Sequence, residues 1–113
     1  MSRPLTRRLV QLRPSEAPDG AGGVTRGWTE GAAHWGHVAL RSGGLRRSEW
    51  GGRERVRVRI TIHALPEGNP SRPRPGERLR EGMRLWAVDA VHPEDSRGRF
   101  LTVFASAVEE GAA

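Results

Sequence analysis

The chain has 113 residues, 19 basic and 13 acidic, with a formal net charge of +6 and a pI near 11.6. It has no cysteine, which excludes a disulfide framework and any thiolate metal site. This length predicts a single domain over residues 1–113, with frayed ends at about 1–4 and 109–113.

The N-terminal segment lacks the apolar run of a signal peptide, and no stretch approaches the roughly 20 apolar residues of a membrane span. We therefore expect a soluble protein that is made inside the cell and has no membrane partner. Every basic residue is arginine, a choice that a genome of high G+C content explains. The excess of positive charge is a separate feature, and it points to nucleic acid or to an acidic protein surface.

The first third of the chain predicts two strands joined by a hairpin. Residues 7–14 read as a short strand that Pro14 closes, and residues 24–41 read as a longer strand with a break or bulge near residues 31–33. The connection "APDGAGGVTRGW" (17–28) contains an Asp-Gly pair, which is a strong hairpin signal. We expect Asp19, Gly20, Gly22 and Gly23 to shape the turn, with Gly22 and Gly23 supplying positive φ angles.

The middle of the chain contains the clearest strand. Residues 42–52, "SGGLRRSEWGG", are flanked by glycine pairs and read as an excursion loop. Residues 53–65 then alternate strictly, with Val56, Val58, Ile60 and Ile62 on one face and arginines, Thr61 and His63 on the other. Period two with β-branched residues on one face predicts a half-buried strand.

The last third predicts an irregular loop followed by a three-stranded meander. Residues 66–77 carry four prolines and two glycines, which favours a loop with polyproline II character. Short strands follow at 77–80, 83–91 and 99–108, with turns at 81–82 and 92–98. We therefore predict an all-β fold: a small antiparallel barrel or sandwich of about six strands with long Gly/Pro-rich loops.

No arrangement of catalytic, cofactor or metal-binding residues is recognisable. The glycines of 20–23 lack the lysine of a phosphate-binding loop, because the chain has no lysine, and they precede a strand rather than a helix. The histidines, expected to be exposed or at interfaces, have no cysteine or carboxylate cluster beside them; they are His34, His37, His63 and His92. No serine lies in a G-x-S-x-G motif. We expect no enzyme activity, no cofactor and no metal.

The arginine row at positions 53, 55, 57 and 59 is the main candidate for binding. Alternate residues of a strand lie about 6.6–6.8 Å apart, similar to successive phosphates of a nucleic acid. The row is either a solvated outer face or a surface for DNA or an acidic subunit. Most of the aromatic residues are at positions that look like core, which disfavours base readout. Trp50, in the Gly-flanked loop, either folds back onto the barrel or anchors in a neighbour.

Taken in order, these segments resemble the head–tail joining family of tailed bacteriophages, also called head-completion or stopper proteins. The similarity rests on "LTRRLVQLRPSEAPDGAGGVTRGWTE" (5–30), "AHWGHVALRSG" (33–43), "RITIHA" (59–64) and "EGMRLWAVDAVHPEDSRGRFLTVFASAVEE" (81–110). The segment "PSRPRPGERLREGMR" (70–84) is similar to versions in the gene transfer agents of alphaproteobacteria. His63 stands where the family usually has arginine, and the Gly-flanked loop replaces a partly helical segment.

The resemblance implies a small β-barrel in a homo-oligomeric ring, expected to be a hexamer. That ring would lie between the portal–adaptor complex and the tail terminator or tail tube, at the neck of a phage or gene transfer agent particle assembled in the bacterial cytoplasm. It would enclose double-stranded DNA without reading its sequence. Contacts between subunits or with the channel are expected from the loops 42–52 and 66–78, and we single out Arg46, Arg47, Trp50, Arg53, Arg72 and Arg74.

Two other functions remain open on the sequence. One is a nucleic-acid-binding β-barrel that acts alone, for which the monomer should bind DNA or RNA with a steep salt dependence. The other is the tail-terminator role in the same particle. The adaptor role is disfavoured, because adaptors are largely helical and no long segment here has a 3.6-residue period.

Overall fold

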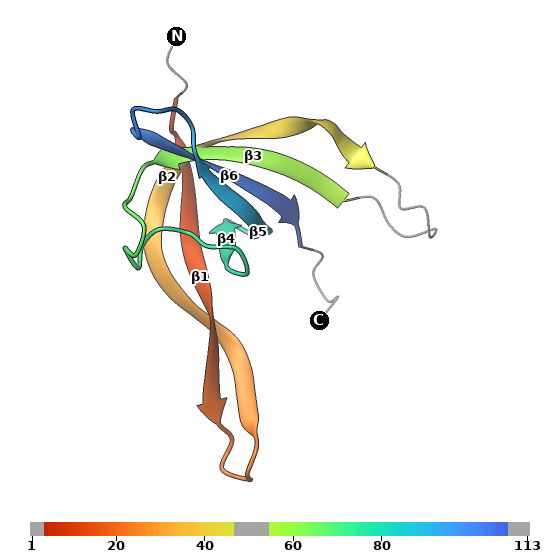
Figure 1. Ribbon diagram of the computed structural model, residues 1–113. Helices are drawn as coiled ribbons and strands as arrows, with labels where there is room; N and C mark the ends of the chain where they lie inside the picture. The colour runs from red at the N-terminus through yellow and green to blue at the C-terminus, as the bar shows by residue number, and fades with distance from the viewer. Residues whose placement is uncertain (1–3, 47–54, 109–113) are drawn as a thin grey trace.

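A computed structural model describes residues 4–46 and 55–108, and within these the fold consists of six β-strands (Figure 1). Their bounds are β1 Arg7–Pro18, β2 Val24–Arg46, β3 Arg55–His63, β4 Arg78–Glu81, β5 Arg84–Pro93 and β6 Phe100–Ala107. No helix occurs among the described residues, and therefore none there is long and apolar enough to cross a membrane.

All six strands belong to one antiparallel sheet that closes on itself. The spatial order is β1-β2-β3-β6-β5-β4, and the ring closes where Val10, Gln11 and Leu12 of β1 pair with β4. Strands β4, β5 and β6 form the predicted meander. The predicted all-β antiparallel barrel of about six strands is therefore confirmed.

The core is filled by the alternating residues of β3 and their neighbours. Val58, Ile60 and Ile62 are almost completely buried, as the period of two predicted. Side chains of β1, β4, β5 and β6 complete the cluster, namely Leu9, Leu79, Trp86, Val88, Leu101, Val103 and Ala105. Arg57, Arg59 and His63 point outward as expected, whereas Thr61 on the same outer face is buried.

The first strand is longer than predicted, because Pro14 does not end it. Strand β1 continues to Pro18 in unbroken register with β2. The predicted break in β2 is confirmed: Val10 pairs with Ala33 and Leu12 with Glu30, so two residues of β2 oppose Gln11 alone. This is a β-bulge, which bends the strand and increases its twist.

The prediction of a loop over residues 42–52 is wrong for its first half. Strand β2 extends to Arg46, and after a second irregularity Leu45 pairs with Val56 and Arg46 with Arg55. The glycines at 43 and 44 suggested a loop, but pairing with β3 holds this segment extended. Residues 47–52 of that loop lie outside the described residues.

Candidate functional site

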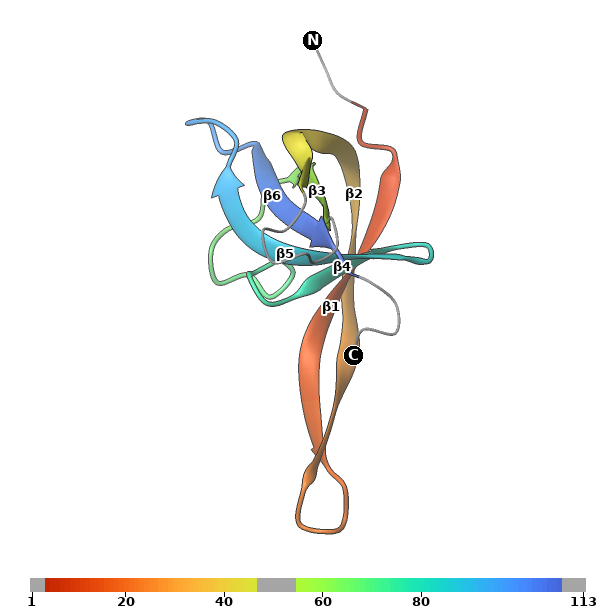
Figure 2. The same cartoon turned by 90° about the vertical axis from the view of Figure 1, so that its right-hand side faces the viewer.

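The most distinctive surface is a two-stranded arm that extends away from the barrel. It consists of residues 13–18 of β1 and 24–29 of β2, with the connection between them at its end (Figures 1 and 2). Most of these residues are exposed, and β1 meets β4 only at residues 10–12. A two-stranded ribbon is at best marginally stable alone in water. The arm is therefore a natural surface for a partner.

The end of the arm is shaped by Asp19. Its Oδ1 accepts hydrogen bonds from the backbone N–H groups of Ala21 at 2.7 Å and Gly23 at 3.0 Å, which lower the pKa of its carboxyl group. Gly20 and Gly22 have φ values of 82° and 87°, which favour glycine. Gly23 does not have the positive φ that we predicted. A Cβ atom there would lie 2.7 Å from Asp19 Oδ2, so its role is close approach.

One face of the arm carries the apolar residues Pro14, Pro18, Val24 and Trp28, with the charged pair Glu16 and Arg26 between them. Pro14 pairs with Trp28 and Pro18 with Val24, so all four side chains lie on one face. Val24 is 53% exposed and Trp28 is 41% exposed. The guanidinium of Arg78 lies over the Trp28 ring, 4.2 Å from its centroid. We predicted core positions for most aromatic residues, and this is wrong for Trp28 and for Trp35, which is 55% exposed.

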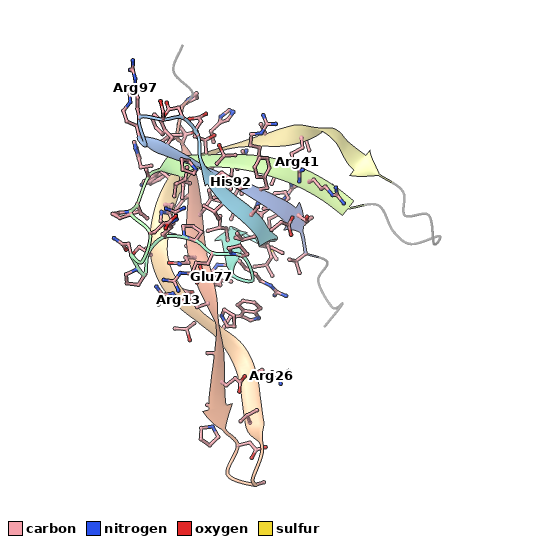
Figure 3. The ribbon with its side chains drawn as sticks, viewed as in Figure 1. Arg13, Arg26, Arg41, Glu77, His92 and Arg97 are labelled. Carbon is pink, nitrogen blue, oxygen red and sulfur yellow. The ribbon has the colours of Figure 1, made fainter. Side chains whose placement is uncertain are left out.

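A buried polar network fastens the Pro-rich loop 66–77 to the base of the arm. The Nε2 of Gln11 donates to the Pro70 carbonyl at 3.1 Å and to Glu77 Oε1 at 2.8 Å. Glu77 Oε1 also accepts from the backbone N–H of Arg74 at 3.1 Å, and Arg13 lies 3.9 Å from the other oxygen of Glu77 (Figure 3). The loop is thus irregular, as predicted, but it is folded onto the barrel.

His34 also faces this loop. Its ring is partly buried, and among the described residues its Nε2 has no hydrogen-bond partner. Burial lowers the pKa of His34, while a hydrogen bond involving the backbone of Ser71 acts in the opposite direction. His34 is therefore not fully exposed, and its location at an interface stays a prediction. No group of three potential metal ligands occurs in the described part of the chain.

A basic face covers the outside of β2, β3 and β6. The guanidinium groups of Arg41 and Arg59 lie 4.9 and 5.9 Å from the centroid of the Phe104 ring. His92 of β5, labelled with Arg41 in Figure 3, meets the same ring edge-on at 5.8 Å. Arg57 is exposed one row further along β3. Within residues 4–46 and 55–108, no carboxylate forms an ion pair with Arg41, Arg57 or Arg59.

The structure places the six predicted contact residues in different situations. Arg46 is the last residue of β2, and Arg47, Trp50 and Arg53 lie outside the described residues. Arg72 and Arg74 lie on the folded-back loop: Arg72 donates to the Leu65 carbonyl at 3.2 Å, and the side chain of Arg74 is exposed. Their roles stay predictions. Sequence reasoning missed the arm, although Pro14 and Pro18 at an interval of four signalled an unusual strand.

Comparison with known proteins gives a consistent result. The sequence profile described as "Phage head completion protein" matches residues 2–109. A chain from the solved structure "Virion of native gene transfer agent (GTA) particle" is 35% identical, with a TM-score of 0.76, and the match covers 95% of this chain and 98% of that one. Protein SF1141 from Shigella flexneri 2a has the same fold, with a TM-score of 0.68, 17% identity and coverage of 95% and 96%. No curated protein matches.

Proposed function

The chain belongs to the phage head completion protein family, and on that premise we propose that it is the stopper of a tailed phage or gene transfer agent particle. As one domain, it forms a homo-oligomeric ring, which we expect to be a hexamer. The ring lies between the portal–adaptor complex on the head side and the tail terminator or tail tube on the other. It retains the packaged DNA and provides the surface on which the tail docks.

The observation that carries this proposal is the similarity, at 35% identity over nearly the whole chain, to a chain of a gene transfer agent virion. The arm adds support, because a ring requires a surface that reaches from one subunit to the next. The ring is assembled in the bacterial cytoplasm and then occupies the neck of the particle. Its role is structural, with no catalytic step.

The basic face is the part of the barrel best suited to the DNA in the channel. Arg41, Arg57 and Arg59 offer three guanidinium groups that have no carboxylate partner among the described residues. Such groups neutralise phosphates whatever the base sequence, and the binding weakens as salt rises. The predicted contacts at Arg46, Arg47, Trp50 and Arg53 belong to the same part of the sequence.

The proposal is tested by deleting the coding sequence in cells that produce particles and restoring it from a plasmid. We expect heads that have lost their DNA and carry no tail, and full complementation by the wild-type chain. Normal yields of filled, tailed particles without the chain would refute the role. Free tails that lack a finished end would instead support the tail-terminator function. Tight DNA binding by the purified monomer, together with normal particles, would support the nucleic-acid-binding function.

A further inference from the structure

Strand β2 changes partner halfway along its length. Its residues 24–36 pair with β1 on one side, and from Gly36 onward it pairs with β3 on the other side. Gly36 is the residue that pairs with both, opposite Arg7 and Ile62. Within the described residues, two segments of β2 therefore keep one edge free: residues 24–28 on the side away from β1, and residues 38–41 on the side away from β3.

The hydrogen-bond pattern of the arm determines which backbone groups face outward. The N–H of Asp19 donates to the carbonyl of Gly23 at 3.1 Å, and the register runs without a shift from there to residues 12 and 30. In an antiparallel pair, hydrogen-bonded and non-hydrogen-bonded pairs alternate. Pro18 and Pro14 thus fall in non-hydrogen-bonded pairs, with their backbone groups turned away from β2.

These two prolines block one edge of the arm. A proline has no N–H to donate, and its ring obstructs an approaching strand, which is why proline protects exposed strand edges. Strand β1 can continue past Pro14 because Pro14 lies in a non-hydrogen-bonded pair, so its missing N–H costs no hydrogen bond to β2. Pro14, Glu16 and Pro18 have backbone groups that face outward on this edge, and of the three only Glu16 has an N–H to donate.

The opposite edge of the arm is open. Val24, Arg26 and Trp28 pair with Pro18, Glu16 and Pro14, so their backbone N–H and C=O groups also face outward. All three have an N–H to donate, and on this outward side no described strand pairs with them. The arm therefore has a blocked edge and an edge that can accept another strand.

Exposed hydrophobic side chains accompany both free segments of β2. Five large hydrophobic residues are exposed in the described chain, and four of them belong to β2. Val24 and Trp28 lie at the arm segment, and Leu40, at 68% exposed, lies at the second segment; Trp35, at 55%, precedes the second segment where β2 still pairs with β1. One strand thus offers two free edges, each with apolar surface beside it.

We propose that the open edge at residues 24–28 pairs with residues 38–41 of β2 in a second copy of this chain. This inference rests on the proposed ring. Two different segments of the same strand meet in such a contact, so it is heterologous and runs from subunit to subunit in one direction, as a ring requires. The blocked edge prevents the arm from pairing in the other direction. With Arg26 across from Ala39, Val24 and Trp28 of one copy would lie on the same face as Trp35 of the next, and Leu40 would point to the opposite face.

A matched pair of proline substitutions tests the edge. Arg26→Pro removes an outward N–H from the open edge, whereas Glu16→Pro removes the outward N–H of its cross-strand neighbour on the blocked edge. Neither breaks a bond between β1 and β2. In particle-producing cells, we expect incorporation of Arg26→Pro into purified particles to fall about tenfold, while Glu16→Pro stays close to wild type. Arg26→Thr, which keeps the N–H and loses the charge, should also behave like wild type.

Introduced thiols test the contact without disturbing the backbone. The chain has no cysteine, so a disulfide between two copies of the Arg26→Cys, Ala39→Cys chain can involve only the introduced thiols. We expect oxidised particles that contain the double variant to yield covalent multimers, because Cα atoms of neighbouring strands lie within disulfide reach. Glu16→Cys combined with Ala39→Cys should remain monomeric. His37→Cys and Arg41→Cys in place of Ala39→Cys cover a shift of two residues in register.

The outcomes separate this inference from the proposed function. Normal incorporation of Arg26→Pro, or no cross-link from Arg26→Cys to any of the three positions, would overturn the inference and leave the stopper role intact. A cross-link to a different particle protein would also overturn it. If both proline variants fail to fold, as judged by circular dichroism, the thiol result decides alone. Normal particles without the chain would refute the stopper role itself.

Discussion

Replacing Gly36 by alanine should destabilise the barrel, because this residue lies in close contact with both neighbouring strands. A Cβ atom there would approach Leu9 Cδ1 to 2.7 Å, the Thr61 backbone oxygen to 3.0 Å and Ile62 Cγ2 to 3.1 Å. Leu9 and Ile62 are completely buried. The oxygen of Thr61 belongs to the backbone of β3 and cannot move without disturbing its pairing.

The size of the effect follows from two opposing terms. Overpacking a close-packed core costs about 1–3 kcal/mol. Replacing glycine by alanine restricts the unfolded chain, which returns about 0.4–1 kcal/mol. We therefore expect Gly36→Ala to lower the free energy of unfolding by about 1–2 kcal/mol, and Tm by roughly 5–10 °C in a chain of this length.

Gly27 provides the matched control on the same strand. A Cβ atom at Gly27 would meet only Ser15 Oγ, at 3.6 Å, an ordinary contact. Gly27→Ala should therefore unfold at the wild-type temperature or slightly above it. Urea and thermal unfolding, followed by circular dichroism, compare the two variants. A Gly36→Ala protein as stable as wild type would show that the core adapts to the added methyl group and that the contact argument is wrong.

Three further predictions concern pH, the buried network and DNA. Burial lowers the pKa of His34 below its ordinary 6.5, so the unfolded chain binds a proton at His34 more readily than the folded chain does. The free energy of unfolding therefore falls as the pH drops from the unfolded-state pKa of His34 toward its lower folded-state pKa. When Tm is measured from about pH 7.5 to about pH 5, the Tm of His34→Gln should decrease less than the Tm of the wild-type chain. Gln11→Leu removes two hydrogen bonds to the Pro-rich loop, to the Pro70 carbonyl and to Glu77. It also removes the buried Oε1 of Gln11, which has no hydrogen-bond partner among the described residues, and this offsets part of the loss. Urea unfolding should show a loss of about 1–2 kcal/mol, and an unchanged midpoint would argue against the network. Arg57→Glu combined with Arg59→Glu should weaken binding of duplex DNA and reduce the salt slope by about 1 per lost phosphate contact, at unchanged Tm.

The strands that bury one face could be predicted from local pattern. Val58, Ile60 and Ile62 alternate with exposed residues, and the meander at the C-terminal end has a turn signal at each connection. The bulge of β2 was predictable for the same reason, because small residues interrupt its alternation. Such features depend on neighbours in the sequence, and these are visible without a structure.

Features that depend on distant partners were not predictable in the same way. Leu45 is extended because Val56 lies across from it, and no local signal in "SGGLRR" indicates that pairing. Gln11 is a polar residue among the apolar side chains of β1, and only the fold brings it to Glu77, 66 positions away. The position of Trp35 on the outer face likewise follows from the partner change of β2, which composition and periodicity do not reveal.

The continuity of β2 has a mechanical consequence. The same strand contains the arm, the bulge and the pairing with β3, with no flexible connection in between. A load applied along the arm would act on the pairing with β1 and β3 in shear, so that many hydrogen bonds perpendicular to the strand resist it together. A sideways pull on the end of the arm would open the β1–β2 pairs one after another. The direction of loading therefore decides how much tension a subunit transmits before it yields.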